Sequence, residues 1–158
     1  MKQLNPRSKS LRILLWIGAI LGRLLLVAVI FMGAMMARMG DVPSDLDYST
    51  TRSSDNRVFE VSYSPSTGAV PVNQMHQWTL HVETTDGQLV ENADITVDGD
   101  MPQHGHGLPT RPRVTKYLGN GDYLVEGMKF QMGGWWLMDF TITADGKTDA
   151  VHFNMMLE

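Results

Sequence analysis

The chain has 158 residues, with 12 Met, 5 His and no Cys. This length excludes a large multidomain enzyme, and the lack of cysteine excludes disulfides, zinc fingers, iron–sulfur ligation and a thiol nucleophile, so any soft-metal chemistry must use Met and His. Residues 1–40 hold six of the 13 basic residues and no acid, which leaves seven bases and all 17 acids, a formal charge of −10, in residues 41–158. An acidic body of this kind argues against nucleic acid as a partner, because nucleic-acid binders usually carry a basic patch.

The first predicted element is a membrane-spanning helix. Residues 13–36 are 24 consecutive positions that are apolar or Gly except for Arg23, and a spanning helix needs about 20. Bases precede this segment and acids follow it, so the positive-inside rule predicts a cytoplasmic segment over residues 1–12 and a single-pass anchor in the inner (cell) membrane over residues 13–37. The lipid bilayer is then a partner, and everything after the anchor is exported to the periplasmic, extracytoplasmic side.

Arg23 leaves two interpretations of this segment open. In the first, the helix spans the membrane and Arg23 faces a partner helix or a water-filled cavity. In the second, Arg23 closes a long basic region and residues 24–37 form the 14-residue apolar core of a signal peptide. Ala34 and Ala37 are three residues apart rather than two, which makes a poor cleavage signal and favours the uncleaved anchor. Both interpretations export the remainder of the chain.

A flexible linker and a β-rich domain are predicted to follow. Residues 38–57 are rich in Ser, Thr, Asp and Asn and have too few apolar residues to bury a core. Residues 58–158 show short alternating apolar runs separated by Gly, Pro, Asn and Asp. Seven strands are predicted, near residues 58–64, 78–82, 93–98, 114–118, 123–127, 136–142 and 151–155. The expected fold is all-β, an immunoglobulin-like antiparallel β-sandwich of about seven strands after one transmembrane helix.

Turn residues and side-chain alternation add local detail. Gly119-Asn120-Gly121 predicts a hairpin, because Asn-Gly between alternating runs is a strong hairpin signal. Neighbouring residues of a strand face opposite sides, so Trp136 is predicted to face the core and Trp135 to face away from it.

The densest group of candidate metal ligands is Met101-Pro102-Gln103-His104-Gly105-His106-Gly107. In an extended segment, residues two apart point the same way, so His104 and His106 are predicted to present both imidazoles to one ion. The intervening glycines allow the backbone to fold closely around it. Polar loop histidines that bind no metal remain the alternative interpretation of the same residues.

Methionines strengthen the metal hypothesis. Met128 and Met132 lie on one face of the run that precedes the Trp pair. Thioethers suit Cu(I) and imidazoles accept Cu(I) or Cu(II), so copper is the expected metal, with Cu(I) favoured. The alternative is that these methionines only fill the core. His76 is predicted to be a satisfied, half-buried histidine, and His81 and His152 are predicted to face solvent.

The sequence gives little support to an enzyme. No nucleophile elbow, P-loop, H-E-x-x-H or G-x-G-x-x-G motif occurs. A cupin-type metal site would need a Glu four or five residues after His106, where Thr110 and Arg111 stand. We therefore expect a protein without catalytic activity.

Three segments carry a family resemblance: Met101-Pro-Gln-His-Gly-His-Gly-Leu-Pro-Thr, Gly119-Asn-Gly-Asp-Tyr and Gly127-Met-Lys-Phe-Gln-Met-Gly-Gly-Trp-Trp. They resemble the YtkA-like domain family, to which the FixH-type membrane-anchored accessory proteins are related. The resemblance implies a single N-terminal anchor, an exported immunoglobulin-like sandwich, and a role in copper handling or in the maturation of copper-containing respiratory oxidases.

The resemblance also suggests roles for individual residues. It puts Met101 and His106 on the family's Met-Pro and His positions of the loop, and Phe130 and Trp136 among its core aromatics. His104 departs from the pattern of the family that this chain resembles, since many of its members have Met at that position. This departure shifts the implied site toward imidazole ligands and toward tolerance of Cu(II).

The sequence therefore leads to a membrane-anchored periplasmic copper-binding accessory protein, which delivers copper to a copper-dependent oxidase or a copper transport complex or assists its assembly. The predicted copper ligands are Met101, His104, His106, Met128 and Met132. The alternative hypothesis is a metal-free β-sandwich interaction module that assists assembly of a membrane complex. In that case Arg23 pairs with an acidic group in a partner's helix, and Trp135 touches the partner.

Overall fold

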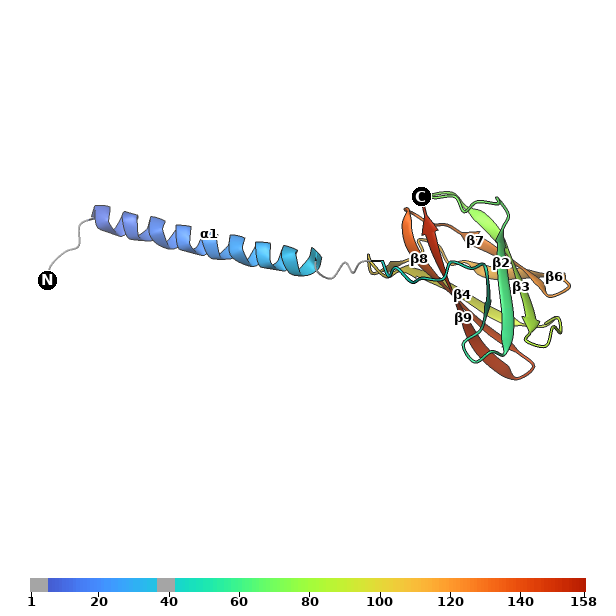
Figure 1. Cartoon of the computed structure of the whole chain (residues 1–158). Helices are drawn as coiled ribbons and strands as arrows, with labels where there is room; N and C mark the ends of the chain where they lie inside the picture. Colours follow the sequence, from blue (N-terminus) through green and yellow to red (C-terminus); the bar gives the residue numbers. More distant parts are fainter. Residues whose placement is uncertain (1–5, 37–41) are drawn as a thin grey trace. The chain divides into compact units, whose positions relative to one another are not determined.

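The computed structural model describes residues 6–36 and 42–158, with side chains described for residues 15–33 and 42–158. The chain divides into two compact units, Met1–Gly40 and Asp41–Glu158. The first contains one helix and the second contains all the strands of the described chain (Figure 1).

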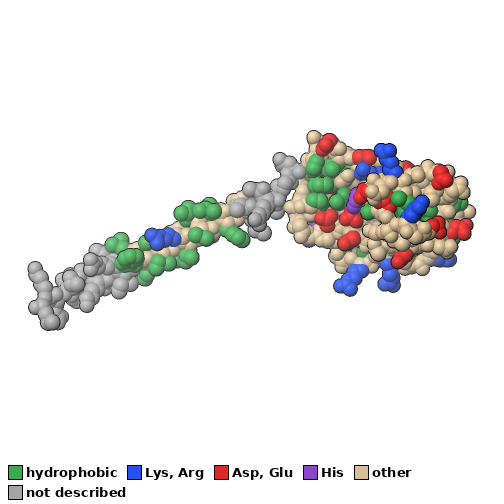
Figure 2. All heavy atoms as spheres, turned by 90° about the horizontal axis from the view of Figure 1, so that it is seen from below, with side chains coloured by type: hydrophobic (Ala, Val, Ile, Leu, Met, Phe, Trp, Pro, Cys, Tyr) green, Lys and Arg blue, Asp and Glu red, His purple; other side chains and the backbone are tan. Residues whose placement is uncertain are grey.

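The N-terminal helix α1 (Pro6–Met36) is long and apolar enough to cross a membrane. Its segment Leu15–Gly33 has a mean hydropathy of 2.4, and Arg23 is its only charged residue. Hydrophobic side chains run along the described part of the helix, interrupted by one basic group (Figure 2). A membrane anchor and a signal sequence share these properties, so both interpretations of the segment remain consistent with the helix.

The second unit is a sandwich of two antiparallel sheets, as predicted. Its strands are β1 (Thr51–Ser53), β2 (Phe59–Pro65), β3 (His76–Thr84), β4 (Asp94–Met101), β5 (His106–Gly107), β6 (Arg113–Gly119), β7 (Asp122–Met128), β8 (Gly134–Ala144) and β9 (Lys147–Leu157). One sheet has the order β1-β2-β3-β7-β6 and the other has the order β5-β4-β8-β9. The seven predicted strands are confirmed, and β1 and β5 are additional.

The core lies between the two sheets and is filled by alternate residues of each strand. On β8, Trp136, Met138, Phe140 and Ile142 are all buried, as the period of two predicts. The ring of Phe140 meets Trp78 of the opposite sheet at a centroid distance of 6.4 Å. These contacts across the sandwich fix which face of each strand is turned to solvent.

Two hairpin loops have the two-residue turn geometry that their sequences predict. Asn120 and Gly121 connect β6 to β7 with φ of 54° and 77°, and Asp145 and Gly146 connect β8 to β9 with φ of 50° and 74°. Positive φ at both central positions matches the twist of the flanking strands, and Asn-Gly and Asp-Gly are the pairs that tolerate it best.

The folded unit begins earlier than the sequence predicts. The predicted linker over residues 38–57 contains β1, which pairs with β2, and the Asp55 amide donates to the Ala150 carbonyl at 2.8 Å. Because β1 is held by backbone pairing and polar side chains rather than by an apolar face, its composition resembles that of a linker. Residues 38–41 of that linker, and residues 1–5 of the predicted cytoplasmic segment, lie outside the described residues.

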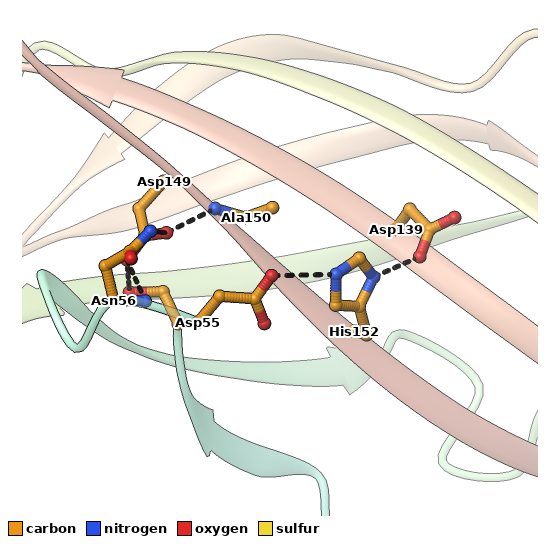
Figure 3. A network of polar contacts seen from close by, with 7 residues as sticks. Asp55, Asn56, Asp139, Asp149, Ala150 and His152 are labelled. Atoms are coloured by element: carbon orange, nitrogen blue, oxygen red, sulfur yellow. Dashed lines mark hydrogen bonds and ion pairs between the residues drawn. The ribbon is translucent and has the colours of Figure 1, made fainter.

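A buried carboxylate attaches this early segment to the last strand (Figure 3). Asp149 is 4% exposed, and its Oδ2 accepts hydrogen bonds from the Ser54 hydroxyl at 2.6 Å and the Asn56 amide at 2.9 Å, while its Oδ1 accepts one from Asn56 Nδ2 at 2.8 Å. Burial alone raises the pKa of Asp149, but these hydrogen bonds outweigh it and lower the pKa to about 2. The ionised side chain therefore holds residues 54–56 against β9.

The two histidines on outer strand faces are paired with acids. His152 Nδ1 lies 2.5 Å from Asp139 Oδ1, and its Nε2 lies 3.2 Å from Asp55 Oδ2 (Figure 3). The hydrogen bond to Asp139 raises the pKa of His152, although partial burial opposes it. His81 Nδ1 lies 2.7 Å from Asp122 Oδ1. Both rings face outward, as predicted, but the Nδ1 atom of each ring contacts an aspartate carboxylate.

Candidate metal-binding loop

The His-Gly-His segment forms a tight hairpin at the edge of the four-stranded sheet. β4 ends at Met101, and β5 returns beside it, with Met101 opposite His106 in the register. The amides of His104 and Gly105 both donate to the Met101 carbonyl at 2.9 Å. Gly105 has a φ of 66°, which glycine adopts without strain. The sequence therefore folds as a compact turn rather than as an extended strand.

This turn brings the two imidazoles together. The ring centroids of His104 and His106 are 5.8 Å apart, and the ring planes differ by 22°. His104 is exposed and His106 is half-buried. Both imidazoles are therefore accessible from solvent.

His106 is oriented by contacts to one of its ring nitrogens. Nδ1 lies 3.3 Å from the Gly107 carbonyl oxygen and 3.0 Å from Gln131 Nε2. Gln131 Nε2 only donates, so the shorter contact makes Nδ1 an acceptor and places the proton of a neutral ring on Nε2. The Gly107 carbonyl only accepts, so its contact is a hydrogen bond only in the other tautomer, in which Nδ1 carries the proton and Nε2 the free lone pair. The ring also packs edge-on against Trp136 at 5.9 Å. Such contacts orient metal-binding histidines in general.

The predicted thioether ligands lie in different environments. Met101 and Met128 are fully buried, whereas Met132 is 38% exposed. Met101 is on the inward parity of β4, and its terminal methyl lies so close to Gly134 that a Cβ there would meet it at 2.8 Å. The Met132 carbonyl accepts a hydrogen bond from Trp136 Nε1 at 3.1 Å. The structure thus brings His104 and His106 together, and the exposed Met132 follows Gln131, whose side chain contacts His106.

Three acidic residues lie near one another on β4 and β8, on the sheet that carries the loop: Asp98, Asp100 and Asp139. Asp100, which pairs with Gly107, precedes the hairpin on β4. Burial raises the pKa of Asp100, and the nearby carboxylates of Asp139 and Asp98 raise it further. A negative potential of this kind attracts cations to the loop. Within the described residues no three side chains among His, Asp and Glu are grouped to hold a metal, so a third ligand at the loop would have to be a thioether or come from outside the domain.

The environment of His76 differs from the predicted one. It is 6% exposed, and its Nδ1 contacts the Gln74 carbonyl at 3.1 Å. Its Nε2 is buried and has no hydrogen-bond partner in the described part of the chain, so the prediction of a satisfied histidine is wrong for this atom. Burial lowers the pKa of His76, and the contact with Gln74 opposes the shift. Met75, directly before His76 in the sequence, is a second soft donor next to this imidazole.

Trp135 is half-buried, and its Nε1 donates to Asn154 Oδ1 at 3.0 Å. Asn154 in turn donates to the Asp47 carbonyl at 3.2 Å. The Trp135 side chain is therefore tied to the outer face of β9 rather than directed at the histidine loop.

A protein-family profile matches the chain. The profile described as YtkA-like matches residues 53–141, more than half of the chain. The chain belongs to the YtkA-like family. The match runs from the last residue of β1 through most of β8 and includes the histidine loop, so this loop lies within the YtkA-like domain.

Two solved structures are similar to the chain at 13% sequence identity. One is a crystal structure of a DUF4426 family protein from Pseudomonas aeruginosa PAO1, with a TM-score of 0.49 over 69% of this chain and 96% of that one. The other is the ZirS C-terminal domain, with a TM-score of 0.37 over 73% of this chain and 81% of that one. No curated protein matches the chain.

Proposed function

We propose that this YtkA-like protein is a membrane-anchored copper-binding accessory protein, whose exported domain holds copper at His104 and His106. The observation that carries the proposal is the pair of nearly parallel imidazoles, 5.8 Å apart, on a short hairpin at the edge of the sandwich. A rigid sandwich supporting an open loop suits an ion that is bound and then passed on.

The available donors fit copper better than a hard cation. The loop offers imidazole nitrogens, and the exposed Met132, next in sequence to the Gln131 that contacts His106, offers a thioether. Imidazole binds Cu(I) and Cu(II), and thioether selects Cu(I). We propose Cu(I) as the main cargo, with His104 and His106 as ligands and Met132 as the third. Met101 and Met128 have buried side chains. In this proposal neither is a ligand of the loop site, and Met101 packs in the core beneath the loop.

The proposed role is carriage rather than catalysis. α1 would keep the domain at the membrane, with its N-terminus cytoplasmic, and the recipient would be a copper-dependent membrane enzyme such as an oxidase, or a copper transport complex. This would be a FixH-like accessory role. The acidic residues on the sheet that carries the loop would concentrate the cation before transfer.

A copper competition titration tests the proposal. Full-length protein in detergent micelles would be titrated with Cu(I) against a chromophoric chelator, beside the double variant His104→Ala/His106→Ala. The matched control is His81→Ala/His152→Ala, which removes two outward-facing histidines elsewhere on the sandwich. We expect the loop variant to lose binding at this site and the control to keep it, with circular dichroism showing both folded. Unchanged Cu(I) affinity in the folded loop variant would refute the proposal.

Met132→Leu separates the two oxidation states. The substitution keeps an apolar side chain of similar volume and removes the sulfur, so we expect weaker Cu(I) binding with Cu(II) binding unchanged. Equal Cu(I) affinity in Met132→Leu and the wild type would exclude the thioether from the site.

A metal-free assembly module is the second candidate function, and a cleft lined by both apolar and polar groups favours it. The cleft has a volume of about 540 Å³ and is lined at the end of β9 by residues that include Tyr48, Tyr63, Met156 and Leu157. A partner's side chains would fill it while Arg23 pairs with an acid in the partner's helix. Arg23→Leu should then weaken co-purification with a membrane complex, and full retention would count against this role.

A further inference from the structure

We propose a second, interior site for a soft monovalent metal ion, Cu(I), formed by the imidazole of His76 and the thioether of Met128. The site lies between the start of β3 and the end of β7. It is separate from the histidine loop and does not depend on copper binding there.

One nitrogen of the His76 ring is held by the backbone, and the other has no hydrogen-bond partner among the described residues. The Gln74 carbonyl only accepts hydrogen bonds, so the contact of 3.1 Å places the proton of a neutral ring on Nδ1. Nε2 then carries a lone pair that is buried and has no partner among residues 42–158. A backbone carbonyl holding one ring nitrogen while the other is free is the usual arrangement of a metal-binding histidine.

Met128 is in position to provide the second ligand. His76 and Met128 are opposite each other in the register of β3 and β7, next to a β-bulge that separates this pair from Trp78 and Val125, and both side chains are buried. Directly opposed residues have Cβ atoms about 4.5–5.5 Å apart, which puts the thioether within reach of the imidazole. One neutral nitrogen and one thioether without an acid suit Cu(I) and exclude hard divalent cations.

The side chains around His76 restrict access to the proposed site but leave one side of it open to solvent. The ring of Phe130 lies 5.7 Å from His76 and that of Trp78 lies 6.2 Å away, so the inner side of the site is aromatic. A pocket of about 410 Å³ on the other side is lined by residues that include Met75 and His76, and Met75 is 61% exposed. Met75 is therefore placed to capture an ion from solvent before it reaches His76.

A buried water is the competing account of the same geometry. Trp78 Nε1 is a donor that is also buried without a partner in the described residues. One water molecule accepting from Trp78 and donating to His76 Nε2 would satisfy both atoms. The test must therefore observe His76 Nε2 itself.

The experiment uses the full-length protein with ¹⁵N-labelled histidine in detergent micelles, titrated with Ag(I) as a redox-stable substitute for Cu(I). Long-range ¹H–¹⁵N spectra report each ring nitrogen separately. We expect the His76 Nε2 resonance to shift with Ag(I) while Nδ1 keeps its proton. Met128→Leu keeps the buried volume and removes the sulfur, so the affinity reported by this resonance should fall at least tenfold. Met138→Leu, which changes another fully buried methionine, should leave it unchanged.

The same titration in the His104→Ala/His106→Ala variant separates the two sites. A His76 response that persists there supports the interior site whatever the loop does. A His76 Nε2 resonance that stays fixed through several equivalents of Ag(I) in folded protein would overturn the proposal and favour the bridging water. An affinity equal in Met128→Leu and the wild type would overturn it as well, because the second ligand would then be wrong.

Discussion

The substitution Asp149→Asn should destabilise the sandwich strongly and change how its stability depends on pH. The carboxylate accepts hydrogen bonds from the Ser54 hydroxyl and from two nitrogens of Asn56. A carboxamide at the same place keeps the shape but has one oxygen instead of two and no charge, so a nitrogen donor would face another donor. The expected loss in the free energy of unfolding follows from the pKa of Asp149.

The pKa of Asp149 is about 2, against an ordinary value of 3.8. One pKa unit corresponds to about 1.4 kcal/mol, so the ionised carboxylate contributes about 2.5 kcal/mol to the free energy of unfolding at neutral pH. Because the folded-state pKa is the lower one, this contribution is present above about pH 4 and is lost as the pH falls to about 2. Asp149→Asn should therefore lose about 2–3 kcal/mol at pH 7 and should show a flatter decline in acid.

Urea denaturation followed by tryptophan fluorescence, at pH 7 and at intervals down to pH 2, measures both effects. The matched control is Asp94→Asn, which neutralises an exposed carboxylate on the outer side of β4 and should change stability by less than about 0.5 kcal/mol. Equal stability of Asp149→Asn and the wild type at pH 7, or an unchanged slope between pH 4 and pH 2, would refute the assignment of this role to the carboxylate.

Three further predictions concern the sandwich itself. Gly134→Ala should lose about 1–3 kcal/mol in thermal unfolding, because the backbone has a φ of 119° and the new methyl would meet the terminal carbon of Met101 at 2.8 Å; a Tm equal to that of the wild type would contradict this. Phe140→Ala should lose about 3–5 kcal/mol because it opens a cavity in the fully buried core, measured by the same urea unfolding. The raised pKa of His152 means that its pairing with Asp139 stabilises the fold below about pH 6.5, the ordinary value, and that this contribution is lost as the pH rises through the raised value. His152→Gln should remove that decline between pH 6 and pH 9, and an unchanged decline would assign it to other groups.

Alternation and turn chemistry were sufficient to predict most of the sandwich. The parity of β8 correctly placed Trp136 inside, and the Asn120-Gly121 hairpin formed as expected. The strand β1 was not predicted because a short polar segment carries no pattern that indicates backbone pairing with β2. Nor does it indicate a hydrogen bond to the Asp149 carboxylate, which is 95 residues from Ser54. Such long-range polar contacts leave no local period in a sequence.

The candidate site was only partly predictable. The spacing of His104 and His106 indicated that they lie together, although the structure achieves this with a turn at Gly105. Met101 is buried because it continues the inward parity of Ile95 and Val97 on β4. The spacing of donor residues in the loop does not show which face of β4 this side chain occupies. The unpaired nitrogen of His76 depends on its packing, which no sequence pattern reports.

The position of β5 also bears on solubility. The two residues His106 and Gly107 occupy one edge of the four-stranded sheet, where a longer exposed β4 edge would invite pairing with other chains. A two-residue strand ending in a tight turn covers the end of β4 while presenting almost no edge of its own. Changes to the histidine loop that lengthen or straighten it should therefore uncover the end of β4 and promote aggregation, so the length of the loop is constrained by its place at the sheet edge.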